Sequence, residues 1–228
     1  MRTTEEALIT AQRKAEELFA EVVDSKLIRA GVLESDLSKE IHALANTRFG
    51  VRRHWHKRIV RCGENTLLRY HDKPPDRRVA DDDVVYLDFG PLFGEWEADF
   101  GRTYVLGAEP RKHKLVHDTA TAFRKGKQRF LSDLALTAGS LYDYVCELAV
   151  EASWQFGAET AGHLIGHFPH ESDPGQGGGF SIRHGNPLNL RERDATGAAR
   201  HWILEIHFVD RVHGLGGFFE ELLTIGPA

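Results

Sequence analysis

Two helical segments followed by strands, in an order that occurs twice, restrict the folds open to this sequence more than any other feature. Apolar residues recur at three- and four-residue spacing over 4–28, which is typical of an amphipathic helix, and the N-terminal helices together cover about 4–48. The helical period returns over 112–133 and 141–156. Because β-branched and aromatic segments follow each helical pair, we expect an α+β domain with two related halves.

The predicted strands are short, and Gly, Pro and Asp separate them. They cover 58–62, 66–70, 84–90, 99–107, 180–185, 201–209 and 217–226. Ser35 or Asp36 is the expected N-cap of the second helix, and surface loops are expected over 173–180 and 189–200. The chain has 228 residues and no linker-like segment, so we expect one domain over 1–228 with a large core.

Composition argues against several classes of partner. The formal net charge is -5 and both signs are spread along the chain, which disfavours nucleic acid or an anionic membrane surface as a partner. No apolar stretch approaches the roughly 20 residues that cross a bilayer. A small polar substrate stays open. With 2 cysteines, no CxxC motif and a charged N-terminus, the sequence predicts a protein of the reducing cytoplasm.

Paired acidic residues give the first indication of chemistry. In "YLDFGPLFGEWEADFGRT" two strands flank a turn, and if Asp88 faces Asp99, the loop is centred on Phe93 and Gly94. Directly opposed side chains have Cβ atoms about 4.5 to 5.5 Å apart. Like charges at that distance repel, and the apolar neighbours imply partial burial. A cation, an arginine or a shared proton must therefore neutralise the pair.

A second predicted hairpin carries a comparable pair. Glu205 faces Glu220 if the loop is centred on Val212 and His213, within the polar connection "DRVHGLG". Four clustered carboxylates need about two divalent cations, or must be largely protonated. Taken singly, each acid is equally well explained as a solvated strand residue.

Histidines are bunched at 54–56 and 163–170. His163, His167 and His170 have helix-like spacings, but Gly and Pro among them oppose a helix, and no Glu directly follows His163 as a zincin motif requires. On an extended or looped backbone the three imidazoles can enter one cavity, with His167 the best candidate for an ordinary loop histidine. The "HWH" segment at 54–56 fits the cavity mouth and a structural strand entry equally well.

These segments resemble the M24 metallopeptidases, the methionine aminopeptidase, prolidase and creatinase superfamily with the pita-bread fold. "YLDFG" and "ADFGRT" are similar to its first two ligand strands, "GHLIGHFPHE" to its histidine segment, and "WILEIHF" and "FFEELLTIG" to its glutamate strands. The resemblance covers nearly the whole chain. It implies a stand-alone catalytic domain of prolidase or aminopeptidase P type, without a creatinase-type N-terminal domain. Two pseudo-symmetric halves of helices would pack on a curved, mainly antiparallel sheet.

Carried over by position, the resemblance implies a set of ligands for two divalent metal ions. They are Asp88, Asp99, His163, Glu205 and Glu220. Asp99 and Glu220 would bridge the ions, which are expected to be Mn2+ or Co2+, with Zn2+ and Fe2+ as alternatives. His170 is similar to the family's histidine that binds the substrate carbonyl, and His71 to a further cavity histidine.

The implied reaction is metal-assisted hydrolysis of a peptide or peptide-like amide bond, as in Xaa-Pro dipeptidases and aminopeptidases. Glu205 is the implied acceptor of a proton from the attacking water. His170 is the implied stabiliser of the tetrahedral oxyanion. A homodimer that completes the cleft is one option for the assembly.

The sequence departs from the family pattern at several positions. Pro is usual at Ile206, Arg at Phe218 in prolidase-like members, and a small apolar residue at His167. Glu221 stands beside Glu220, which leaves open which of the two is the ligand. Two alternatives to the dinuclear metallohydrolase therefore stay open. One is a metal-independent, creatinase-like hydrolase of a small amide, and the other is a non-catalytic binding protein on the same fold.

Overall fold

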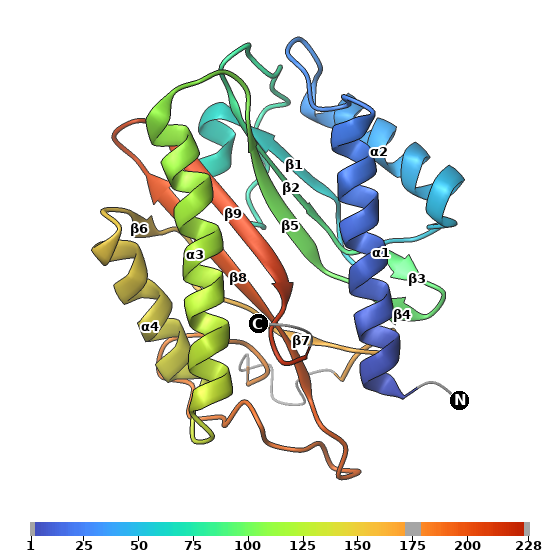
Figure 1. The fold of residues 1–228 in the computed structure, drawn as a ribbon, viewed down its shortest axis with the longest axis vertical. Helices are drawn as coiled ribbons and strands as arrows, with labels where there is room; N and C mark the ends of the chain where they lie inside the picture. The colour runs from blue at the N-terminus through green and yellow to red at the C-terminus, as the bar shows by residue number, and fades with distance from the viewer. Residues whose placement is uncertain (1–2, 172–178, 226–228) are drawn as a thin grey trace.

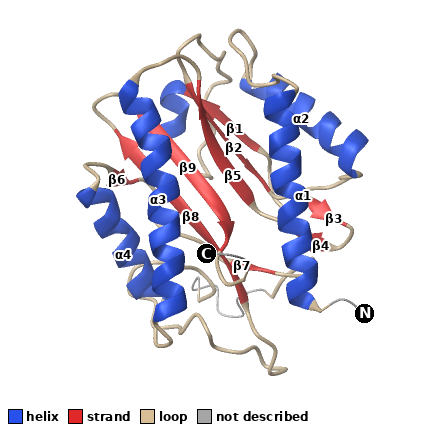
Figure 2. Cartoon of the chain, viewed as in Figure 1, coloured by secondary structure: helices blue, strands red, loops and turns tan. Residues whose placement is uncertain are grey.

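Two pairs of helices alternate with two groups of strands in the computed structural model, which describes residues 3–171 and 179–225 (Figures 1 and 2). The α-helices are α1 (Thr4–Asp24), α2 (Glu34–Phe49), α3 (Pro110–Ser132) and α4 (Ala138–Glu151). A short 3-10 helix, η1, covers Gly63–Leu67. The strands are β1 (Ile59–Cys62), β2 (Val84–Phe89), β3 (Leu92–Phe93), β4 (Trp96–Glu97), β5 (Phe100–Val105), β6 (Gln155–Phe156), β7 (Leu164–Ile165), β8 (His201–Asp210) and β9 (Leu215–Leu222).

The main sheet joins the two groups of strands symmetrically. Its order is β1-β2-β5-β9-β8-β6, with β7 beside β8, and these neighbours pair antiparallel. Strands β1, β2 and β5 precede α3 in the chain, whereas β9, β8 and β6 follow it in mirrored order. Strands β3 and β4 form a separate ribbon. The predicted α+β class with two related halves is confirmed.

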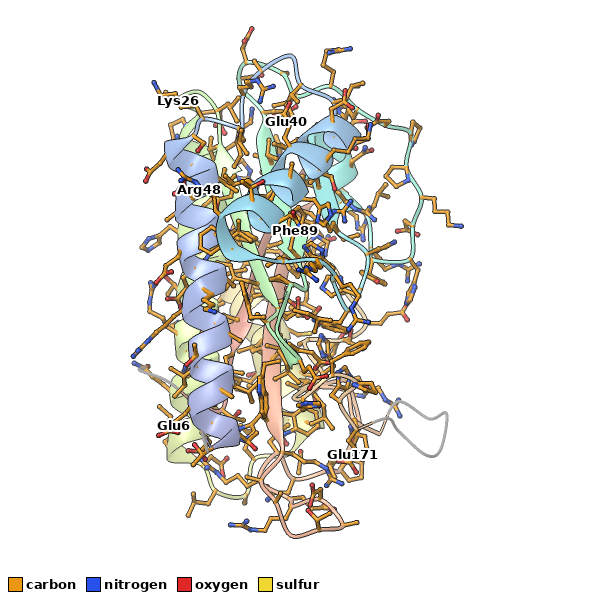
Figure 3. The ribbon with its side chains drawn as sticks, turned by 90° about the vertical axis from the view of Figure 1, so that its right-hand side faces the viewer. Glu6, Lys26, Glu40, Arg48, Phe89 and Glu171 are labelled. Atoms are coloured by element: carbon orange, nitrogen blue, oxygen red, sulfur yellow. The ribbon has the colours of Figure 1, made fainter. Side chains whose placement is uncertain are left out.

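The helices cover one face of the sheet (Figures 1 and 3). Strand alternation directs Asp88, Glu205 and Glu220 to the other face. In β2, Leu87 and Phe89 pack with Phe19 of α1 in one buried core. Asp88, between them, points to the opposite face. In β8, the apolar neighbours of Glu205 pack in a second core with residues of α3 and α4, so this acid also faces away from the helices.

The predicted register of the first hairpin is wrong. Asp88 faces Gly101 rather than Asp99, which directly precedes β5 and lies outside the ladder. The loop is centred one position later than predicted because the β3–β4 ribbon turns at Gly94 and the residue after it. Gly94 has a φ of 71°, the conformation that a type II′ turn needs at its first central residue.

The predicted register of the second hairpin is confirmed. Glu205 faces Glu220, and the loop between the strands is centred on Val212 and His213. The ladder runs without interruption from the pair of Ile203 to the pair of Asp210. Counting equal numbers of residues from the two acids therefore locates the turn of this hairpin correctly. The same count fails in the first hairpin, where the β3–β4 ribbon interrupts the strands.

A narrow seam between β5 and β9 joins the two halves. The backbones pair there at Gly101 and Glu220. Thr103 strengthens the seam, since its hydroxyl oxygen accepts from the backbone N–H of Phe218 (2.6 Å) and its hydroxyl donates to the carbonyl oxygen of the same residue (2.8 Å). The Arg102 guanidinium donates across the seam to the carbonyl oxygen of Glu220 (2.8 Å).

Two predicted strands are wrong. Residues 66–70 belong to the end of η1 and the loop after it, and the Thr66 hydroxyl bonds back to the Gly63 carbonyl within the 3-10 turn. Over 180–185 there is one isolated bridge, from Ser181, instead of a strand. β-branched composition is typical of strands, but the hydrogen bonds of these short segments are isolated ones, such as that of Ile182 to Gly162, and do not form a ladder.

The predicted N-cap of α2 is also wrong. Leu33 occupies that position and makes no side-chain cap. Asp76, distant in the chain, accepts from the Ser35 backbone N–H (3.0 Å) and hydroxyl (2.7 Å) and so replaces the local cap.

Surface loops are confirmed over 189–200, where the structure describes no helix or strand. The predicted loop over 173–180 lies largely outside the described residues. Among the described helices, none combines the length and the apolar character needed to pass through a lipid bilayer.

Replacing Phe19 tests how α1 supports the strand that carries Asp88. The buried ring packs edge-on against Phe89 and Phe100, with centroid distances of 6.0 and 4.8 Å. Phe19→Ala should therefore lower the free energy of unfolding by about 3 to 5 kcal/mol. Val23→Ala, on the same helix but 48% exposed, is the matched control and should change it by less than about 0.5 kcal/mol. Urea unfolding measures both, and equal effects would contradict this packing.

Candidate metal centre

A cavity of about 640 Å³ lies on the sheet face opposite the helices. Every residue predicted for the site lines it, namely Asp88, Asp99, His163, Glu205, Glu220, His170 and His71. Strands β2, β8 and β9 contribute one acid each, and Asp99 directly precedes β5. The two halves of the chain thus bring their acids to one place.

His163 is held between the backbone and two of the acids. Its Nδ1 lies 2.7 Å from the carbonyl oxygen of Leu164, so Nδ1 carries the proton of this hydrogen bond. Nε2 lies 3.1 Å from Asp99 Oδ2 and 3.5 Å from Glu205 Oε1. The segment is extended rather than helical, as predicted, with β7 starting at Leu164. Histidines that bind metals are typically oriented by such a bond from the other ring nitrogen.

A second imidazole, that of His56, lies in the same cluster. Its Nε2 is 3.0 Å from Asp99 Oδ1 and 3.5 Å from Asp88 Oδ1, and its side chain is only 8% exposed. Its Nδ1 bonds to the carbonyl oxygen of Lys57 at 2.7 Å. The "HWH" segment is expected either at the cavity mouth or as a structural strand entry. His56 lines the cavity, whereas His54 packs beside His42.

Burial and mutual repulsion control the protonation of the acids. Burial raises the pKa of Asp88 and the pKa of Glu205 to about 7 each. Burial, with the charge of Asp99, raises the pKa of Glu220 well above its ordinary value. Burial also opposes ionisation of Asp99, but the two neighbouring imidazoles outweigh it and hold the pKa of this carboxyl below its ordinary value.

Burial tends to lower the pKa of an imidazole, but the neighbouring carboxylates outweigh this effect at His56 and His163. Burial disfavours the charged form of His56, but the carboxylates of Asp99 and Asp88 outweigh burial and raise its pKa to about 10. Burial likewise opposes the charging of His163, and its hydrogen bond to Asp99 and the charge of Glu205 raise its pKa to about 9. Two positive rings therefore offset part of the carboxylate charge within the protein itself.

Glu220, and not Glu221, faces the cavity. The Glu221 side chain pairs instead with Arg102, whose guanidinium lies between the rings of Phe100 (3.8 Å) and Phe219 (3.7 Å). The Oε2 atom of Glu220 is buried and has no hydrogen-bond partner among the described residues. A buried carboxylate oxygen without a partner is costly, which points to a ligand that the protein atoms alone do not supply.

Two groups of donor atoms in the cavity fit a cation, and Glu220 belongs to one of them. Within each group the atoms lie within 4.8 Å of one another, and the groups are His56, Asp88, Asp99 and Asp99, His163, Glu220. Asp99 belongs to both, with Oδ1 toward His56 and Oδ2 toward His163. Carboxylate and imidazole donors in this arrangement suit two neighbouring divalent ions that share Asp99.

His170 is oriented by a buried acid. Its Nδ1 lies 2.8 Å from Glu97 Oε2, and the carboxylate of Glu97 also accepts from the backbone N–H groups of Gly166 (3.0 Å) and His170 (3.2 Å). The His170 ring stacks beside that of His163, with centroids 6.1 Å apart. His170 therefore borders the donor groups without belonging to either.

The remaining histidines considered in the sequence, His71 and His167, belong to neither donor group. His71 is exposed and packs against Tyr70, with ring centroids 5.2 Å apart. His167 has a half-exposed side chain that bonds to Glu95 at 3.2 Å, and it does not line the cavity. It is the loop histidine, as predicted.

Sequence reasoning missed Glu97, and for His56 and Trp55 it left the cavity mouth and a structural strand entry as equal alternatives. Glu97 carried a usable signal, because on an extended segment it shares a face with Asp99, two positions later. The bunched aromatic residues at 54–56 carried a weaker one. Nothing in the sequence shows that this segment pairs with the loop after β2, since its backbone is irregular.

Comparison with known proteins agrees with this arrangement. Curated relatives include putative Xaa-Pro aminopeptidases from Mycoplasma genitalium (29% identical) and Mycoplasma pneumoniae (28% identical), each over 119 residues. These alignments cover 50% of this chain and 32% of each relative, so the chain matches about a third of their length.

Solved structures with the same fold extend the comparison. A Thermococcus sibiricus prolidase has a TM-score of 0.75 at 20% identity, over 96% of this chain and 55% of its own. A Bacillus anthracis Xaa-Pro dipeptidase has a TM-score of 0.75 at 19% identity, over 100% and 62%. A Rickettsia prowazekii methionine aminopeptidase has a TM-score of 0.69 at 17% identity, over 99% of both chains. The pita-bread fold expected from the sequence is confirmed.

The sequence profile of Metallopeptidase family M24 matches residues 6–195, a range that contains Asp88, Asp99 and His163. The match covers most of the chain, and the remaining acids of the cavity, Glu205 and Glu220, follow on the next two strands. Family profile, fold and cavity thus agree, and the chain belongs to metallopeptidase family M24.

Proposed function

We propose that this chain is a dinuclear metal-dependent hydrolase that cleaves a peptide or peptide-like amide bond, with Xaa-Pro peptides as the substrate class. The observation that carries the proposal is the buried, unpartnered Oε2 of Glu220 beside two donor groups that share Asp99. The names of the similar proteins, which include Xaa-Pro aminopeptidases and a prolidase, support the substrate class. Mn2+ or Co2+ are the proposed ions.

Asp88, Asp99, His163, Glu205 and Glu220 would hold the ions, which when bound supply Lewis acidity and lower the pKa of water. Glu205 is the proposed general base. Its carboxylate borders the cavity beside His163, where it can accept a proton from the attacking water and return it to the leaving amine.

His170 is the proposed stabiliser of the oxyanion. Because its Nδ1 is occupied by Glu97, the nitrogen left for the substrate is Nε2. A hydrogen bond from Nε2 to the carbonyl oxygen would stabilise the negative charge that develops there. Glu97 acts through this ring and is a positioning residue.

Aromatic side chains form the proposed substrate wall. Trp55, Tyr70, Tyr86 and Phe218 line the cavity and suit an apolar ring such as that of proline. Phe218 stands where prolidase-like members usually carry an arginine. Without that positive charge to pair with a free C-terminal carboxylate, the wall is better suited to longer Xaa-Pro peptides than to dipeptides.

A metal-independent, creatinase-like hydrolase is the second candidate. The observation that favours it is the pair of imidazoles, His56 and His163, which offset carboxylate charge without a cation. Full activity after exhaustive chelation would support this candidate. Tight peptide binding without turnover on any substrate would instead favour the binding protein.

Asp99→Asn tests the shared ligand. The wild-type chain, loaded with Mn2+ and desalted, should hold about two ions, because each donor group includes Asp99. Asn carries no charge and should lose both. Asp82→Asn is the matched control, since Asp82 is 77% exposed and distant from the cavity, and it should keep both ions. Elemental analysis measures the stoichiometry, and full retention of metal by Asp99→Asn would contradict the proposal.

Glu205→Gln tests the proton acceptor. With a panel of Xaa-Pro dipeptides, longer Xaa-Pro peptides and amides, kcat should fall by roughly 10²- to 10⁴-fold, the usual contribution of a general base. Glu151→Gln removes an exposed acid at the end of α4, away from the cavity, and should leave kcat nearly unchanged. An unaffected kcat in Glu205→Gln would exclude this residue as the base.

Glu97→Gln tests the orientation of His170. The amide keeps the size of the side chain but removes the negative charge that orients the His170 ring, so kcat should fall by about 10- to 100-fold, as when an orienting partner is lost. KM and metal content should change little, because Glu97 contacts neither donor group. A rise in KM at constant kcat would assign Glu97 to substrate binding instead.

A further inference from the structure

We infer that His56 is a sixth protein ligand of the metal centre, which completes, with Asp88 and Asp99, the cation position opposite His163. The inference rests on the proposed metal-dependent function. It adds a residue to the ligands that the family resemblance implies, and it gives each of the two cation positions its own imidazole.

Backbone pairing fixes the segment that carries His56. The backbone N–H of Trp55 donates to the carbonyl oxygen of Gly90 (2.9 Å), and that of Leu92 donates to the carbonyl oxygen of Arg53 (3.1 Å). The segment therefore lies beside the loop that connects the two acidic strand ends of the first half. The position of His56 follows from this pairing and not from a freely moving surface loop.

A glycine leaves room for the ring. A Cβ atom at Gly90 would lie 2.2 Å from His56 Cδ2 and 2.4 Å from its Nε2. The same Cβ would lie 2.4 Å from Nε1 of Trp55, which is itself tied to the carbonyl oxygen of Ala98 at 3.0 Å. Any larger residue at this position would displace the imidazole from the acids.

The ring presents the correct nitrogen for ligation. Its Nδ1 is bound to the Lys57 carbonyl oxygen, which leaves Nε2 toward Asp88 and Asp99. His163 has the same arrangement, with Nδ1 on a backbone carbonyl and Nε2 on the other oxygen of Asp99. Each mirrored half of the fold thus supplies two acids and one imidazole held in the same way.

The extra nitrogen donor has a consequence for metal preference. Imidazole suits Co2+, Zn2+ and Fe2+ better than Mn2+, for which oxygen donors are the usual ligands. A centre with two imidazoles should therefore bind Co2+ more tightly relative to Mn2+ than the same centre with His56 removed.

Two measurements test the inference. First, wild-type protein with ¹⁵N-labelled histidine is titrated with Zn2+, and the ring-nitrogen NMR signals of His56 and His163 are both expected to shift on binding. Second, calorimetric titration with Co2+ is expected to give two binding events in the wild type. In His56→Gln one event should weaken by at least about 10- to 100-fold, since losing even an indirect partner of a metal costs that much.

His163→Gln and His167→Gln serve as reference variants. His163→Gln should weaken the other event, whereas His167→Gln, which alters a half-exposed loop imidazole, should leave both unchanged. Circular dichroism verifies that each variant is folded, and the NMR titration of the wild type does not depend on any variant.

The outcomes separate this inference from the proposed function. If two ions bind but only the His163 signal shifts, and His56→Gln keeps both affinities, His56 is not a ligand and the inference falls alone. If His56→Gln loses one event while the wild type cleaves no amide, the ligand assignment stands and the proposed function falls. If the wild type binds no ion, both fall.

Discussion

Four carboxyl groups buried around one cavity impose the main physical constraint on this protein. Asp88, Asp99, Glu205 and Glu220 stand close enough to repel, and burial alone would keep most of them protonated. Two imidazoles supply positive partners within hydrogen-bonding reach of Asp99, yet one oxygen of Glu220 still has none among the described residues. Divalent cations bound in the cavity would remove this cost.

The mirrored sheet explains how one chain assembles such a cluster. Each half contributes a strand pair whose alternation sends apolar residues to the helices and acids to the cavity. The halves meet at a seam of little backbone pairing, so side chains do much of the joining. Thr103 bonds both backbone groups of Phe218, and Arg102 reaches Glu220 and Glu221. The acids therefore depend on contacts that neither half makes alone.

How much the sequence predicts depends on how regular each segment is. The uninterrupted β8–β9 ladder allows the Glu205–Glu220 register to be counted from the residues, whereas the inserted ribbon at Gly94 shifts Asp99 out of its predicted pairing. Strand alternation directs Asp88, Glu205 and Glu220 to the cavity, and the spacing of the family motifs locates the other predicted site residues that line it. The position of His56 depends on tertiary pairing of an irregular segment, which no periodic pattern records.

The seam also bears on how the chain folds. Arg102 and Glu220, which share a hydrogen bond across it, are 118 positions apart in the sequence. Closing a loop of that length costs conformational entropy before any contact offsets it, so we expect the two hairpins to form early and the seam late. A half-formed chain would hold only part of the donor set. Metal ions would then stabilise the folded protein without directing its folding.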